Sequence, residues 1–237
     1  MCGRNAPGVT MEYGDIHFPL LKEVARQIPA GIVVQFHRDG EPLLYHNLSA
    51  AISLFKNSIT NIVTNGKLLL DRKNDLIGKL TTLSISIFER DHESEEQYNI
   101  ITEFLRIKGD QKPYVTLRIV GEVDLARYKK LGVPFVFRTL RSPLGNADYQ
   151  RAPCIPEIGV CWDFLQKPCI SWNGEFSICC GFDPEKKGVL GNINHSPIAS
   201  LWGGTTRSLW MERHLTGHRE QVPLCATCDY WGIPVSP

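Results

Sequence analysis

Three common signals are missing from this sequence of 237 residues. It has no excess charge of one sign, because 26 Lys and Arg residues stand against 25 Asp and Glu residues, for a net charge of +1. That balance argues against a broad electrostatic surface for nucleic acid. No apolar run is long enough to cross a bilayer, since charged residues, Pro or Gly interrupt every candidate. No basic-then-apolar leader is visible, so we expect a cytoplasmic protein with reduced thiols.

Cysteine is missing from a long central stretch. None occurs between Cys2 and Cys154, whereas the other seven of the eight cysteines lie at positions 154–228. Repeats and low-complexity tracts are absent as well. The composition, 43% hydrophobic and 22% charged, is ordinary for a globular protein. The length suits one barrel-like domain, or a domain of about 150 residues with an appendage.

From Ile16 to about Arg138, helical and strand-like patterns alternate. Helical spacing of apolar residues predicts helices at 21–28, 48–55, 71–79, 92–107 and 125–130. Short apolar or β-branched runs predict strands at 32–36, 59–64, 83–87, 114–120 and 135–137. Repeated strand–helix units with right-handed crossovers imply a parallel sheet. Polar motifs follow several of these strands, and functional sites collect at such strand ends.

The pattern changes at residues 141–156, which are rich in turn residues and lack periodicity. We therefore predict two domains, at residues 1–145 and 146–237. The second contains all five tryptophans and most of the cysteines. It shows too little regular structure for a large core, so a metal centre is expected to stabilise it.

The C-terminal cysteines have the spacing of metal ligands. Cys225 and Cys228 form a Cys-x2-Cys knuckle, which aims two sulfurs at one ion or cluster. The hairpin signal Asn173-Gly174 brings Cys179 back towards Cys161. Cys180 adjoins Cys179, and because neighbours on an extended segment point to opposite faces, we expect one of the two to bind. Zinc and an iron-sulfur cluster both remain open at this point, with a disulfide as a third reading.

The stretch from Cys161 to Cys228 resembles the SPASM domain, an auxiliary-cluster extension of radical S-adenosylmethionine (SAM) enzymes. The resemblance covers nearly 70 residues. It rests on Cys161, 170–174, 179–180, 190–193, 201–202 and 223–228. It implies one [4Fe-4S] cluster held by Cys161, Cys179, Cys225 and Cys228, with Cys180 in place of Cys179 as the alternative.

The N-terminal part resembles the radical SAM core, a partial (β/α)6 barrel. Met1-Cys2-Gly3-Arg4 is similar to the end of that family's Cys-x3-Cys-x2-Cys loop, which makes Cys2 a cluster ligand. The segment 39–42 resembles the Gly-Gly-Glu-Pro segment that binds the SAM amino group, with Asp39 in place of the first Gly. By the same resemblance, the cofactor-binding residues are Gly40, Glu41, Pro42, Asn65, Ser86, Arg118 and Gly121. Arg118 would meet the SAM carboxylate, Gly121 would let adenine approach, and Phe88-Glu89 replace the family's usual Asp-Gly.

The resemblance implies a radical SAM/SPASM enzyme of oxidoreductase type. Such an enzyme cleaves SAM to a 5′-deoxyadenosyl radical, which abstracts a hydrogen atom from a peptide, protein side chain or sugar-like substrate. A flavodoxin or ferredoxin is the implied reductant, and no nucleic acid or membrane partner is expected.

Of the three cysteines that the radical cluster needs, this sequence contains only Cys2. We therefore expect an N-terminally truncated barrel without its first strand, which does not cleave SAM by itself. SAM and a second [4Fe-4S] cluster are expected only where that motif is complete. The alternative is a non-catalytic, metal-stabilised binding or partner module derived from the same fold, and a zinc-stabilised structural protein is a third reading.

Overall fold

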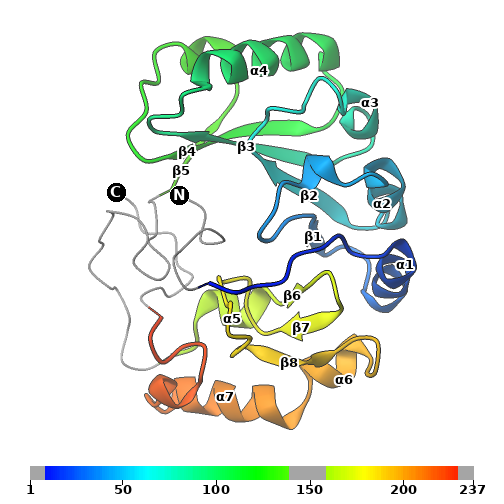
Figure 1. The fold of residues 1–237 in the computed structure, drawn as a ribbon, viewed down its shortest axis with the longest axis vertical. Coiled ribbons are helices and arrows are strands. Elements are labelled where there is room, and N and C mark those ends of the chain that lie inside the picture. The colour runs from blue at the N-terminus through cyan, green and yellow to red at the C-terminus, as the bar shows by residue number, and fades with distance from the viewer. Residues whose placement is uncertain (1–8, 139–158, 229–237) are drawn as a thin grey trace. The chain divides into compact units, whose positions relative to one another are not determined.

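The computed structural model describes residues 9–138 and 159–228 and divides them into two compact units (Figure 1). One unit comprises residues 29–140, and the other combines residues 1–28 with residues 141–237. The predicted boundary near residue 145 lies outside the described residues and stays a prediction.

The unit of residues 29–140 is built on a five-stranded sheet, whose strands follow one another in chain order and pair in parallel. Its strands are β1 (Val33–Gln35), β2 (Ile59–Thr64), β3 (Thr82–Phe88), β4 (Tyr114–Val120) and β5 (Phe135–Arg138). The helical connections are η2 (Pro42–Leu44), α2 (Leu48–Leu54), α3 (Lys73–Leu76), α4 (Ser94–Lys108) and η3 (Tyr128–Leu131). The predicted parallel α/β sheet is thus confirmed.

The predicted elements agree with the observed ones to within a few residues, with one difference in type. The helix expected at 125–130 is a short 3-10 turn, η3, which ends at Gly132 in the left-handed conformation, φ 68°. Glycine adopts this conformation without steric cost, so the chain turns there directly into β5. The longest described helix, α4, has 15 residues, and none of the described helices could span a membrane.

The two faces of the sheet differ in polarity. Side chains on one face pack beneath α2, α3 and α4 and form the main core, which includes Ile62, Leu83, Ile85, Ile87, Val115, Leu117, Ile119 and, from α4, Ile101 and Phe104. The opposite face contains Asn61, Thr82, Ser84, Ser86, Thr116 and Arg118, which are neighbours in the strand register. Because side chains alternate along a strand, the polar face is a direct consequence of the sequence pattern.

The C-terminal part of the other unit is a small three-stranded antiparallel sheet with short helices. It comprises α5 (Trp162–Gln166), β6 (Cys169–Ile170), β7 (Glu175–Ser177), β8 (Val189–Asn192), α6 (Ile198–Trp202), α7 (Thr205–Leu215) and η5 (Arg219–Gln221). The hairpin predicted at Asn173-Gly174 joins β6 to β7, and Gly174 has φ 88°. The amide nitrogens of Asn192 and Asn194 both donate to the carbonyl of Asn173 at 3.1 Å, which fixes the turn.

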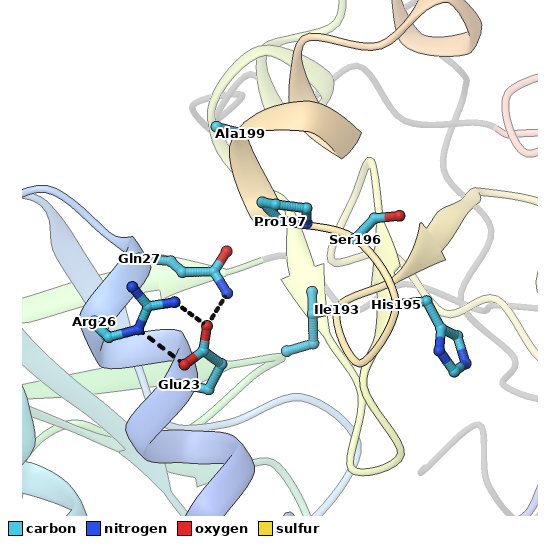
Figure 2. A pocket seen from close by; sticks show the side chains of 8 residues that line it. All are labelled: Glu23, Arg26, Gln27, Ile193, His195, Ser196, Pro197 and Ala199. Atoms are coloured by element: carbon cyan, nitrogen blue, oxygen red, sulfur yellow. Dashed lines mark hydrogen bonds and ion pairs between the residues drawn. The ribbon is translucent and has the colours of Figure 1, made fainter.

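Helix α1 (Phe18–Gln27) belongs to this same unit, although it precedes the parallel sheet in sequence. The side-chain oxygen of Gln27 accepts a hydrogen bond of 2.7 Å from the backbone nitrogen of Ile198, at the start of α6. Between α1 and the loop before α6 lies an open hollow of about 470 Å³ (Figure 2). Its charged groups are already satisfied, because Glu23 accepts hydrogen bonds from Arg26 and Gln27.

The main core makes a direct stability test possible. Phe104 is fully buried beneath the sheet, so Phe104→Ala is expected to lower the free energy of unfolding by about 3–5 kcal/mol through lost burial and a residual cavity. Leu44→Ala is the control, because Leu44 is 68% exposed and should cost less than about 0.5 kcal/mol. Denaturant unfolding followed by circular dichroism measures both, and equal effects would contradict the assigned core.

Candidate functional site

Glu41 lies in the loop that follows β1, and its carboxylate joins two strand ends. One oxygen accepts hydrogen bonds from the Leu43 backbone nitrogen at 3.0 Å and from the Thr64 hydroxyl at 2.7 Å. The other oxygen accepts from the Asn65 backbone nitrogen at 2.9 Å. Bonds to an ionised carboxylate are among the stronger ones in proteins, so Glu41 fixes the C-terminal end of β2 against the loop after β1.

The predicted residues Asn65 and Ser86 are joined through α4. The side-chain nitrogen of Gln97, itself buried, donates to the carbonyl oxygens of Asn65 at 2.5 Å and Ser86 at 3.0 Å. The side-chain oxygen of Asn65 accepts from the Lys67 backbone nitrogen at 2.9 Å and so caps the following turn. The structure therefore brings Glu41, Asn65 and Ser86 together at one edge of the sheet. Gly40 and Pro42 flank Glu41, with Pro42 opening η2.

Gly121 follows β4 with φ 83°, and its missing side chain leaves room for Glu89. A Cβ at position 121 would lie 2.3 Å from a carboxylate oxygen of Glu89. Glu89 is buried and accepts a hydrogen bond of 2.7 Å from the Glu122 backbone nitrogen. Gly121, which the resemblance assigns to the adenine site, is thus next to the buried carboxylate of Glu89. In the sequence, Glu89 was noted only as a departure from the family's usual Asp-Gly.

Cationic side chains gather on the polar face. Arg118 lies on β4, and burial lowers its pKa, with the positive charge of Arg138 on β5 as a second cause. His37 follows β1, and burial together with the nearby charge of Arg118 lowers its pKa to about 4, so its imidazole is neutral at pH 7. The Nε of Arg118 and the Nδ1 of His37 are buried without a hydrogen-bond partner. The sequence analysis did not select His37, although its position directly after a strand was a usable signal.

Four of the predicted metal ligands lie in the described part of the other unit, and Cys2 lies outside the described residues. Cys161 and Cys225 are buried in one small apolar cluster with Phe164, Ile178 and Val222, and Cys179 packs against it. Cys228 is close enough for its charge to act on both Cys161 and Cys225. The guanidinium of Arg219 donates to the carbonyl oxygens of Cys225 at 2.9 Å and Cys228 at 3.0 Å, which holds the Cys-x2-Cys turn in shape.

Cys179 and Cys180 do not point to opposite faces, as we had expected from an extended segment. The chain bends at Ile178, after β7 ends, and the sulfurs of both cysteines and a carboxylate oxygen of Asp163 all lie within 4.8 Å of one another. Alternation holds only within a regular strand, so the argument from neighbouring residues does not apply here. Asp163, which is buried and forms an ion pair of 2.6 Å with Lys167, was not selected from the sequence.

The donor set fits a thiophilic metal centre. Burial raises the pKa of the Cys225 thiol to about 12 and also raises that of Cys161. Buried thiols of this kind ionise only when a cation compensates their charge, and metal binding supplies that compensation. No disulfide joins any two of the six described cysteines. Cys161, Cys225, Cys228 and either Cys179 or Cys180 are the residues that could hold the centre.

Comparison with known proteins supports this assignment. Residues 161–229 match the SPASM family, which is described as an iron-sulfur cluster-binding domain. No curated protein matches the chain.

Two solved structures share the fold. BtrN in complex with AdoMet and 2-DOIA is 20% identical, with 92% of this chain and 82% of that chain covered and a TM-score of 0.61. Selenomethionine BtrN in an open conformation is also 20% identical, with 92% and 81% covered and a TM-score of 0.53. The chain therefore combines a segment that matches the SPASM family with an α/β fold similar to that of BtrN, which confirms the predicted resemblance to radical SAM/SPASM proteins.

Proposed function

We propose that the C-terminal cysteines hold one [4Fe-4S] cluster through Cys161, Cys179, Cys225 and Cys228. The observation that carries this proposal is that Cys161, Cys179 and Cys225 belong to one small core inside the segment that matches an iron-sulfur cluster-binding domain. Cys228 is close enough for its charge to act on Cys161 and Cys225. Cys179 is preferred over Cys180 because it packs against the core of Cys161 and Cys225, whereas Cys180 is exposed. Arg219 supports the site by fixing the carbonyls of the Cys225–Cys228 turn.

We further propose that, where the N-terminal cysteine motif is complete, the parallel sheet binds SAM at the C-terminal ends of its strands. Ligands of open and barrel-like parallel sheets bind at this edge, and the likeness to BtrN with bound AdoMet supports the same use here. When bound, SAM together with an iron-sulfur cluster supplies a 5′-deoxyadenosyl radical that abstracts hydrogen from a substrate. By the family resemblance, Arg118 would bind the SAM carboxylate.

By the family resemblance, the proposed substrate is a peptide, a protein side chain or a sugar-like molecule. The reductant is proposed to be a flavodoxin or ferredoxin, and the compartment the cytoplasm. No part of the proposed site requires nucleic acid or a membrane.

A second function is favoured by two observations at the strand ends. Both carboxylate oxygens of Glu41 accept hydrogen bonds from neighbouring described residues of the chain, and Glu89 takes up the space beside Gly121. Both features reduce the room and the free acceptors for SAM. They support a non-catalytic module, in which the cluster stabilises the fold and the polar face binds another ligand.

Metal analysis of cysteine variants tests the cluster. The wild-type chain is expected to contain about four iron and four acid-labile sulfide ions, with the visible absorption of a [4Fe-4S] cluster. Cys225→Ser and Cys179→Ser should lower both contents by more than about half, because each removes a thiolate ligand. Cys169→Ser is the matched control, since Cys169 lies on β6 in the same unit but outside the ligand set.

The same measurements separate the alternatives. Cys180→Ser should retain the cluster, and a loss of iron in Cys180→Ser but not in Cys179→Ser would exchange their roles. One zinc per chain without sulfide would reject the iron-sulfur cluster altogether.

Equilibrium binding of SAM separates the catalytic fold from the non-catalytic module. Arg118→Gln is expected to weaken SAM binding about tenfold, because one charge-assisted pair with the carboxylate is lost. Arg106→Gln is the control, as Arg106 is an exposed residue of α4 paired with Glu103. A wild-type chain that retains its iron but shows no SAM binding would support the non-catalytic module instead.

A further inference from the structure

Arg118 and Arg138 lie side by side on the polar face of the parallel sheet. Val136 pairs with Arg118 across β4 and β5, and Arg138 pairs with Val120, so the two arginines are on the same face. Because Val120 follows Arg118 by two residues on β4, Arg138 lies one side-chain position further along this face, nearer to the C-terminal ends of the strands. Their charges act on one another, because Arg138 is one cause of the lowered pKa of Arg118.

We propose that this pair binds an anionic oxygen group of the substrate, a carboxylate or a phosphate, with Arg138 as its main contact. This inference rests on the proposed function, since it names the substrate class of the same site. Guanidinium groups bind both kinds of oxyanion in a bidentate manner, and this geometry is the usual reason for arginine at such positions.

Within residues 9–138 and 159–228, no carboxylate pairs with either of these arginines. The five strands carry no Asp or Glu on this face, where the charged residues are Arg118 and Arg138. The nearby carboxylates at the sheet edge are engaged elsewhere. Asp39 pairs with Arg38 at 3.1 Å, and Glu89 accepts from the Glu122 backbone nitrogen. None of the ion pairs among the described residues includes Arg118 or Arg138.

Two buried nitrogen atoms in and beside this pair make no hydrogen bond. The Nε of Arg118 is buried and has no hydrogen-bond partner, and the Nδ1 of His37 is in the same condition. Buried polar atoms without partners are uncommon and costly, and one explanation for them is an absent ligand. A neutral His37 adds a hydrogen-bonding group to the site without adding a third charge.

SAM alone does not supply enough negative charge for two arginines. SAM carries one carboxylate together with an ammonium and a sulfonium group, so it brings more positive than negative charge. Its carboxylate can pair with Arg118, whereas Arg138, which is exposed at the end of β5, remains available for a second oxyanion. A substrate with its own oxyanion supplies that charge.

Titration calorimetry of the whole chain at pH 7, with inorganic phosphate and with acetate at constant ionic strength, tests the site. At least one of the two anions is expected to bind in a saturable manner. Arg138→Gln should weaken this binding at least tenfold, and Arg138→Lys should give an intermediate affinity because the charge remains but the fork is lost. Arg106→Gln, an exposed arginine on α4, should retain the wild-type affinity, and circular dichroism confirms that each variant is folded.

Each result decides the proposal. Binding of phosphate alone assigns a phosphorylated substrate, and binding of acetate alone assigns a carboxylate. Saturable binding that persists in the presence of SAM supports a second anion site. The proposal is overturned if neither anion binds, if Arg138→Gln behaves like Arg106→Gln, or if SAM displaces the anion completely. A chain that binds the anion through Arg138 but does not bind SAM would reject the proposed SAM function and leave the anion site intact.

Discussion

The difference between the two faces of the parallel sheet is the constraint on which the rest of this unit depends. One face packs beneath α2, α3 and α4 and forms the apolar core. The other face carries hydroxyl, amide and guanidinium groups, among them Asn61, Ser86 and Arg118. Glu41 and Gln97 then bind the loops at the strand ends to this rigid frame, so the polar face ends in a well-defined edge.

The two candidate sites bind groups of opposite charge. The cysteine site collects groups that become anions, and only a metal cation makes their ionisation favourable in a buried setting. The sheet face collects cations and lacks acidic neighbours among its strand residues. Each site is thus incomplete in charge, and the sign of the missing charge identifies the chemical class of what binds: a thiophilic metal centre in one, oxyanions in the other.

Much of the sheet could be predicted from the sequence, because its strands are short apolar runs and its helices have clear apolar stripes. The limits of β2 and β4 match the prediction, and α2 and α4 differ from it by no more than two residues. The failures arose where regular periodicity stops. The bend after β7 turns Cys179 and Cys180 to the same side, and the space beside Gly121 is taken by Glu89, a long-side-chain contact that no local pattern encodes. The approach of Asp163 to Cys179 and Cys180 depends on tertiary packing, so no local pattern indicated it either.

Helix α1 has a consequence for how the C-terminal unit folds. Gly14 lies against the ring of Trp172, whose indole nitrogen donates to the Glu12 carbonyl at 3.2 Å, and Gln27 accepts from the Ile198 backbone. These two hydrogen bonds join residues that lie 160 and 171 positions apart in the sequence. The unit therefore cannot assemble its complete surface as the chain emerges in order, because its N-terminal portion must wait until the whole parallel sheet has been synthesised. Its final packing belongs to the last stage of folding, after the cysteine-bearing segment has become available.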